Sequence, residues 1–134
     1  TKHVNFACQS MWYSISQSLS IKERYSLKHN VQYDCVILSR FDVAPQSPVK
    51  VDNYNISSLN THSEKKPRGE ISDWFMFGSN SIINSIGSIY NNLDFHVYNL
   101  SKDDKITVNE AYLREHLKML NIDVSKNDDI IVTF

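Results

Sequence analysis

YDCVILSRFD, residues 33–42, is the most informative segment for the fold class of this 134-residue chain. Its centre, residues 35–38, is a continuous apolar run of the kind found in a strand that is buried on both faces. Before it, residues 9–29 carry apolar side chains at helical spacing, and their cationic side chains collect near the end, where they favour a helix C-terminus. A helix that leads directly into a buried strand is typical of α/β proteins. We therefore expect a single α/β domain that covers residues 1–134.

The patterns that follow this strand are shorter. Residues 71–78 are rich in aromatic side chains and predict a strand. The apolar spacing of residues 82–93 predicts a helix, with Ser79 or Ser81 as its cap. Residues 43–70 hold all three prolines of the chain and show no periodicity. Connections of this length without a pattern are uncommon in compact domains, so we expect a long flexible loop there.

The last part of the chain predicts one more helix and one more strand. Thr107 and Glu110 have the spacing of a capping box, in which each side chain accepts a hydrogen bond from the backbone N–H of the other residue. Apolar side chains then follow on one face of the predicted helix. Residues 130–134 have the composition of a closing strand.

Charge and cysteine content narrow the possible partners. Fourteen basic residues against fifteen acidic ones give a net charge of −1, so no basic field would attract nucleic acid. No apolar run approaches the roughly 18 residues of a transmembrane segment. Cys8 and Cys35 are the only cysteines, and we expect both to be reduced, which favours a cytoplasmic location.

The first candidate site is Ser39-Arg40-Phe41-Asp42, at the end of the predicted buried strand. Binding sites of open α/β sheets form at the ends of strands. Arg40 and Asp42 would share one side of an extended chain. Asp42 could then hold a divalent cation, since Mg²⁺ and Mn²⁺ prefer oxygen ligands, while Arg40 contacts a phosphate. The alternative is a structural Arg–Asp pair, and the spacing alone favours it.

The second candidate is Asp73, which precedes the aromatic run Trp74-Phe75-Met76-Phe77. A carboxylate beside apolar rings suits a general base that works near neutral pH. An aromatic face such as that of Trp74 also suits a sugar ring, because the C–H groups of the sugar pack against it. The alternative is that Asp73 caps a turn and the aromatic residues belong to the core, which the sequence alone favours.

Glu110 is the third candidate, with His116 further along the same predicted helix. These two residues do not share a helix face, and Glu110 already has a role in the capping box, so a structural interpretation is favoured. The five histidines do not fall at zinc-ligand spacing. The sequence also lacks a G-x-S-x-G elbow and a phosphate-binding glycine loop.

Three segments taken together resemble a known family. They are YDCVILSRFD (33–42), ISDWFMFGS (71–79) and NEAYLREHL (109–117), in a stretch that covers about residues 9–120. Their order and content are similar to those of polysaccharide glycosyltransferases from bacterial surface-polysaccharide loci and some large viruses. The family pattern is YD-x-V-I-x-x-R-x-D, then D-x-F-x-F-G-S, then E-x-x-L-x-x-H-L. The resemblance implies a small GT-A-like sheet flanked by helices, part of a nucleotide-diphospho-sugar transferase fold.

By position, the resemblance also implies roles for single residues. Arg40 and Asp42 would lie at the donor-phosphate and metal site, with Mn²⁺ or Mg²⁺ as the cation. The motif here is Arg-x-Asp where such enzymes usually have Asp-x-Asp, which puts the cation in question. Asp73 would be the catalytic base near the sugar, with Trp74 beside it as a substrate contact. Glu110 would lie on the acceptor side.

Enzymes of this family are about twice as long, with a nucleotide-binding βαβ unit before the first helix. The resemblance thus implies that this chain is the C-terminal part of a larger glycosyltransferase. Its implied function is transfer of a sugar from a nucleotide-sugar donor to a carbohydrate acceptor in polysaccharide synthesis. The alternative from another class is a non-catalytic carbohydrate- or protein-binding module that uses residues 74–77 as its platform. A purely structural subdomain is a third possibility.

Overall fold

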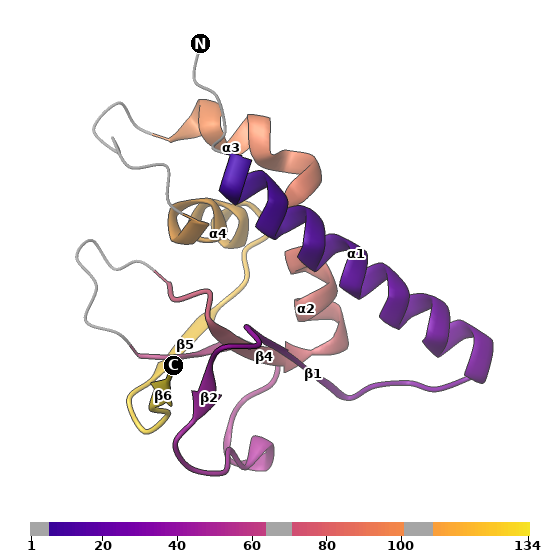
Figure 1. Ribbon diagram of the computed structural model, residues 1–134, viewed down its shortest axis with the longest axis vertical. Coiled ribbons are helices and arrows are strands. Elements are labelled where there is room, and N and C mark those ends of the chain that lie inside the picture. Colours follow the sequence, from indigo (N-terminus) through magenta and orange to yellow (C-terminus); the bar gives the residue numbers. More distant parts are fainter. Residues whose placement is uncertain (1–5, 64–70, 101–108) are drawn as a thin grey trace.

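The structure is a computed structural model and describes residues 6–63, 71–100 and 109–134. Its main sheet has four strands in the order β1-β4-β3-β5, which are Cys35–Ser39, Phe75–Ser79, Leu59–His62 and Val124–Asn127. Helix α2 (Asn80–Gly87) lies between this sheet and the long helix α1 (Phe6–His29), as Figure 1 shows. The predicted α/β class is correct at this level.

Helix α1 forms where the sequence predicts it. It buries three side chains that recur at helical spacing: Cys8, Trp12 and Leu19. The helix ends where Asn30 adopts a positive φ of 51°, and the Val31 N–H then donates to the Ser26 carbonyl at 3.0 Å. Asparagine tolerates this left-handed conformation, which turns the chain so that open carbonyl groups at the helix end find donors.

Strand β1 lies at one edge of a mixed sheet. It pairs antiparallel with β4, which pairs antiparallel with β3, while β3 and β5 are parallel. Because Ser39 is opposite Phe75, the C-terminal end of β1 meets the N-terminal end of β4. The prediction that β1 is buried on both faces is wrong at Ile37, whose side chain is half exposed. Its apolar run belongs to an edge strand instead of a central one.

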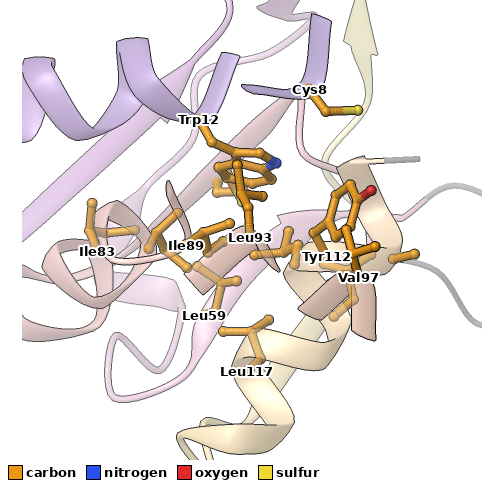
Figure 2. Close-up of a cluster of buried hydrophobic side chains, with 14 of the residues drawn as sticks. Cys8, Trp12, Leu59, Ile83, Ile89, Leu93, Val97, Tyr112 and Leu117 are labelled. Atoms are coloured by element: carbon orange, nitrogen blue, oxygen red, sulfur yellow. The ribbon is translucent and has the colours of Figure 1, made fainter. Parts of the chain in front are cut away.

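Two apolar clusters hold the sheet on its two faces. The larger one joins the sheet to the helices, and Figure 2 shows several of its members, including Trp12, Leu59, Ile83 and Tyr112. The smaller one is formed by Phe75, Phe77 and Ile130. Within β4, Met76 belongs to the first cluster and its neighbours Phe75 and Phe77 to the second, because consecutive strand residues point to opposite faces. This explains the continuous apolar composition of β4.

The segment predicted as a long loop, 43–70, contains regular structure where it is described. Residues 43–63 include the short strand β2 (Ala44–Pro45), the 3₁₀ helix η1 (Val51–Asn53) and β3. Strand β2 pairs with β6 (Val132–Thr133) in a second, two-stranded sheet. The expectation of an unstructured connection is therefore wrong for residues 43–63, and residues 64–70 lie outside the described part. Strand β3 was missed because its sequence, LNTH, is mostly polar although all four residues are buried.

Helix α2 begins at one of the two predicted caps, since the Ile82 N–H donates to Ser79 Oγ at 3.3 Å. It ends at Gly87 instead of continuing to residue 93. The 3₁₀ helix η3 (Tyr90–Asn92) and helix α3 (Leu93–Asn99) follow, and α4 (Asn109–Met119) matches the next predicted helix. Thr107 of the predicted capping box lies outside the described residues. Among the helices described here, none combines the length and the apolar character that crossing a bilayer requires.

Candidate functional site

Four predicted site residues lie where β1 ends beside the start of β4, namely Arg40, Asp42, Asp73 and Trp74, and the fifth, Glu110, is on α4. The Arg40 N–H donates to the Trp74 carbonyl at 3.1 Å, which extends the contact between these strands by one pair. A turn follows, closed by the Val43 N–H, which donates to the Arg40 carbonyl at 3.2 Å. Asp42 therefore belongs to a turn and not to the strand, and the turn brings its carboxylate back to Arg40.

Arg40 and Asp42 form a bidentate ion pair. Arg40 Nε lies 2.9 Å from Asp42 Oδ1, and a terminal guanidinium nitrogen lies 2.6 Å from Oδ2. Hydrogen bonds from Arg40 hold the pKa of Asp42 below its ordinary value, and the same bonds raise the pKa of Arg40. The guanidinium also lies 5.9 Å from the ring centre of Trp74 and 5.8 Å from that of Phe134, which are cation–π distances. A carboxylate and two aromatic rings thus orient the Arg40 side chain.

A cleft of about 440 Å³ opens between α1 and this end of β1. Arg40 and Asp73 both line it, and the negative charge of Asp73 contributes to the raised pKa of Arg40. Asp73 is nearly buried, with 9% of its surface exposed. The other lining residues combine apolar side chains with hydroxyl groups, among them Met11, Ile15 and Leu38, and Ser14, Ser18 and Ser39. Asp42 is not a lining residue, and its connection to the cleft is the ion pair with Arg40.

Asp73 and Glu110 both lie close enough to Cys8 for their charges to raise the pKa of its thiol. Burial raises the pKa of the Cys8 thiol, and the charges of Asp73 and then of Glu110 raise it further. Cys8 is on α1 one turn before Met11, which lines the cleft. The structure therefore brings Asp73 and Glu110 toward the same end of α1. Glu110 itself does not line the cleft.

The aromatic segment 74–77 lies mostly in the core. Phe75, Met76 and Phe77 are buried, because they fill the clusters on the two faces of β4. The expectation that this segment forms a binding platform is therefore wrong for three of its four residues. Trp74 is partly exposed, and its ring stacks with that of His62 and meets the edge of Phe134.

One aromatic residue of the cleft was not singled out from the sequence. Phe41 is fully exposed and lines the cleft next to Arg40. The sequence signal for it is the position of a large apolar residue between two polar ones, directly after a strand. A residue in such a turn has no core to join, so its ring is available to a ligand.

In the described parts of the chain, the donor groups do not fit a resident divalent cation. These parts contain no group of three or more His, Cys, Asp or Glu side chains that could hold a metal ion. Asp42, the predicted ligand, has both carboxylate oxygens engaged by Arg40. A cation there would have to displace a guanidinium that is itself held by two rings. We therefore derive no chemical step through a metal.

Fold and cleft together define an α/β protein with an oppositely charged pair, Arg40 and Asp73, at the end of an edge strand. No family model, no curated protein and no solved structure matches this chain. The chemistry of the cleft is the basis on which its function is inferred.

Proposed function

We propose that the cleft binds the sugar-diphosphate part of a nucleotide-sugar, and that the chain is part of a glycosyltransferase of polysaccharide synthesis. One observation carries the proposal: Arg40 and Asp73 line the same cleft at the C-terminal end of β1. A guanidinium is suited to a diphosphate because its planar donors match phosphate oxygens. A nearby carboxylate is suited to a hydroxyl group of a sugar. Strand ends are also the usual place of ligand sites in α/β sheets.

Arg40 is the proposed contact for the diphosphate. Its guanidinium is oriented by Trp74, Phe134 and Asp42, so little side-chain freedom is lost when a ligand binds. A phosphate would share or replace the carboxylate of Asp42, which is exposed and able to move away. In this assignment Asp42 positions Arg40 in the free protein and is not a metal ligand.

Asp73 is the proposed general base. It would accept the proton of an acceptor hydroxyl while the acceptor oxygen forms a bond to the anomeric carbon of the donor sugar. The bond between that carbon and the diphosphate breaks in the same step, and Arg40 stabilises the negative charge that the diphosphate gains. Because Asp73 is nearly buried, its charge acts in a region with little water, where electrostatic effects are stronger.

Trp74 and Glu110 complete the proposed site. Trp74 orients Arg40, and the exposed part of its ring is the proposed sugar contact. Glu110 lies beyond the cleft, near Cys8 and Asp73, and is proposed to face the acceptor. A GT-A-like sheet is part of this proposal, and it is supported by three strands of one direction with β4 opposed to them. A cytoplasmic location is also proposed, supported by the finding that Cys8 and Cys35 are not joined by a disulfide.

Calorimetric titration with UDP-glucose, UDP-galactose and GDP-mannose tests the proposal, each in the presence of Mn²⁺ and again in EDTA. We expect saturable binding of at least one of them, unchanged by EDTA. Arg40→Gln should weaken this binding by about tenfold to a hundredfold, since a hydrogen bond to a charged group contributes about 1.5–3 kcal/mol. Ser16→Ala, which lies in a different groove of α1, is the control and should bind as the wild type does. Failure of all three donors to bind would remove the proposal.

A carbohydrate-binding module is the second candidate, and the exposure of Phe41 favours it. An exposed ring beside serine hydroxyls can hold a neutral sugar without any phosphate. The two functions differ in their ligands, because a module binds oligosaccharides in the absence of nucleotide. Binding of neutral oligosaccharides that is lost in Phe41→Ala and unaffected in Arg40→Gln would favour the module over the transferase.

A further inference from the structure

Two buried histidines connect three helices outside the cleft at the β1 turn. His96 Nε2 of α3 lies 2.9 Å from His116 Nδ1 of α4, and the two side chains are 1% and 0% exposed. On its other side, His116 Nε2 lies 2.8 Å from the Ser85 carbonyl and 2.8 Å from Ser88 Oγ, at the C-terminal end of α2. The pair therefore links α2, α3 and α4.

The partners determine where the protons are. A carbonyl oxygen can only accept, so His116 Nε2 must carry a hydrogen and donate it toward Ser85. A neutral His116 then has a lone pair on Nδ1, which accepts from the N–H at His96 Nε2. Ser88 Oγ donates to the Ser85 carbonyl at 2.7 Å, so its oxygen is free to accept from His116. Every bond of the network is satisfied when both imidazoles are neutral.

The same proton positions argue against Ser88 as a nucleophile that is activated by His116. Ser88 beside His116 and His96 has the spacing of a nucleophile with a base and an orienting group. A base must accept the serine proton, however, and His116 Nε2 is a donor in this arrangement. The Ser88–His116–His96 chain is therefore a structural connection.

Adding a proton to His116 disturbs this connection. The new hydrogen would sit on Nδ1 and face the N–H of His96, so the bond between the rings persists only where His96 moves its own hydrogen to Nδ1 and accepts at Nε2. Burial lowers the pKa of His116, and it lowers the pKa of His96 to about 4, with the charge of His116 acting in the same direction. Both histidines thus resist protonation in the folded state and accept it readily when exposed.

The charged groups around the two histidines do little to stabilise a positive charge on either imidazole. Glu115 of α4 favours protonated His96, but its carboxylate is in ion pairs with Arg114 at 3.2 Å and Lys118 at 3.7 Å. A groove between α1 and Ser88 is lined by one acidic side chain, Glu23, and one basic side chain, Arg24. Beyond α4, α3 carries one charged side chain, Asp94, and α1 carries four, of which Glu23 and Arg24 line this groove and Lys22 and Lys28 do not.

Helix α3 depends on its packing against the rest of the fold. It has seven residues, and a helix of this length is not stable on its own in water. Its buried side chains are Leu93, His96 and Val97, so His96 is its polar attachment to the neighbouring helix. We propose that α3 is an acid-released element: protonation of the His96–His116 pair detaches it from α4 and exposes Leu93 and Val97 while the sheet remains folded.

Hydrogen–deuterium exchange of the wild-type chain tests this at pH 7.0 and pH 4.5, with rates converted to protection factors. Each histidine is neutral in the closed state and has an ordinary pKa in the open state. Lowering the pH from 7.0 to 4.5 therefore shifts the equilibrium toward the open state by about a hundredfold for one such histidine. Protection of residues 93–99 should fall by about that factor or more, while β4 and α2 change by less than about threefold. Parallel loss in α3, α2 and β4, or no loss in α3, would overturn the proposal.

A double variant shows whether the two histidines are the cause. His96→Gln keeps an amide N–H donor, and His116→Asn keeps an acceptor near the position of Nδ1, but neither side chain titrates. In this variant the protection of α3 should no longer depend on pH. His29→Gln removes an exposed histidine of α1 as a control and should behave as the wild type does. Retained pH dependence in the double variant would also overturn the proposal.

Discussion

Both carboxylate oxygens of Asp42 accept hydrogen bonds from the guanidinium of Arg40. The carboxylate therefore already uses two of the N–H donors that a ligand would need. Arg40 is the cation of the cleft, and Asp42 is a competitor for it. A ligand phosphate must share the donors of Arg40 with Asp42 or displace it. As a competitor, Asp42 weakens the binding of a phosphate, whereas as a metal ligand it would strengthen that binding.

Asp42→Asn should strengthen the binding of a nucleoside diphosphate in EDTA by about threefold to tenfold. The amide competes less well than a carboxylate for Arg40, which frees the guanidinium for phosphate. Thermal stability should change little, because the pair is exposed and such pairs contribute little. Calorimetry with UDP measures the first effect. Asp52→Asn, in η1, is the matched control, and weaker binding in Asp42→Asn alone would contradict competition between Asp42 and the phosphate.

Asp73→Asn should make the Cys8 thiol more acidic. The negative charge of Asp73 raises the pKa of Cys8, and the neutral amide removes this contribution. The rate of alkylation of Cys8 by iodoacetamide, followed against pH by mass spectrometry, should therefore rise at lower pH than in the wild type. Glu110→Gln should shift the profile in the same direction but less, since its contribution is the smaller one. Cys35 is an internal reference, because Asp73 is not among the causes of its raised pKa, and equal shifts of both thiols would contradict the placement.

Tyr112→Phe should leave the free energy of unfolding unchanged or increase it by up to about 1 kcal/mol. The Tyr112 hydroxyl is buried and has no hydrogen-bond partner among the described residues, so the variant removes an unsatisfied polar group. Tyr54→Phe is the comparison, because its hydroxyl donates to Asp129 at 2.7 Å and its loss should cost up to about 1 kcal/mol. Urea denaturation measures both. A clear loss of stability in Tyr112→Phe would mean that this hydroxyl has a partner.

Gly78→Ala should destabilise the chain by about 1–3 kcal/mol. A Cβ at this position would lie 3.1 Å from the Ser58 carbonyl oxygen and 3.1 Å from Ile82 Cγ2, and the backbone contact cannot move aside easily. Gly87→Ala is the contrasting variant. Its nearest contact is the end of the Leu19 side chain at 3.0 Å, which can rotate, so we expect a change smaller than about 1 kcal/mol. Denaturation curves with equal effects for both variants would contradict this difference.

The sequence predicts the elements that follow simple periodicity. Helix α1 shows apolar spacing and a cationic end, and both features form as expected. Ser79 was one of two equivalent caps for α2, and the structure selects it. These features are local, so the residues of the segment are sufficient to specify them.

The elements that were missed depend on partners distant in the chain. Strand β3 is buried by β4 on one side and β5 on the other, so its polar side chains find partners that its own sequence does not reveal. For example, the Thr61 hydroxyl donates to the Ser72 carbonyl at 3.0 Å. Strand β1 was assigned to the interior because four apolar residues in a row do not show whether one edge of the strand is open.

The sequence indicates which residues belong to the candidate site but not how their side chains contact one another. The hypothesis from the sequence needs Asp42 and Asp73 to share one cleft, whereas the structure places Arg40 and Asp73 in the cleft and Asp42 beside it, paired with Arg40. The ion pair of Asp42 with Arg40 could not be distinguished from a metal site, since the turn that joins them is set by one hydrogen bond from Val43. Phe41 was overlooked because exposure of a ring is a property of the fold.

A map of the residues that respond to UDP-glucose shows whether the cleft at Arg40 and Asp73 is the ligand site. A ¹⁵N-HSQC titration of the wild-type chain with UDP-glucose follows every backbone amide in one experiment. We expect shifts concentrated at Ser39, Arg40, Phe41, Asp73 and Trp74, with little change around the polar cleft formed by Lys50, Tyr54 and Asp129. Shifts centred on that second cleft, or no shifts at millimolar ligand, would contradict it.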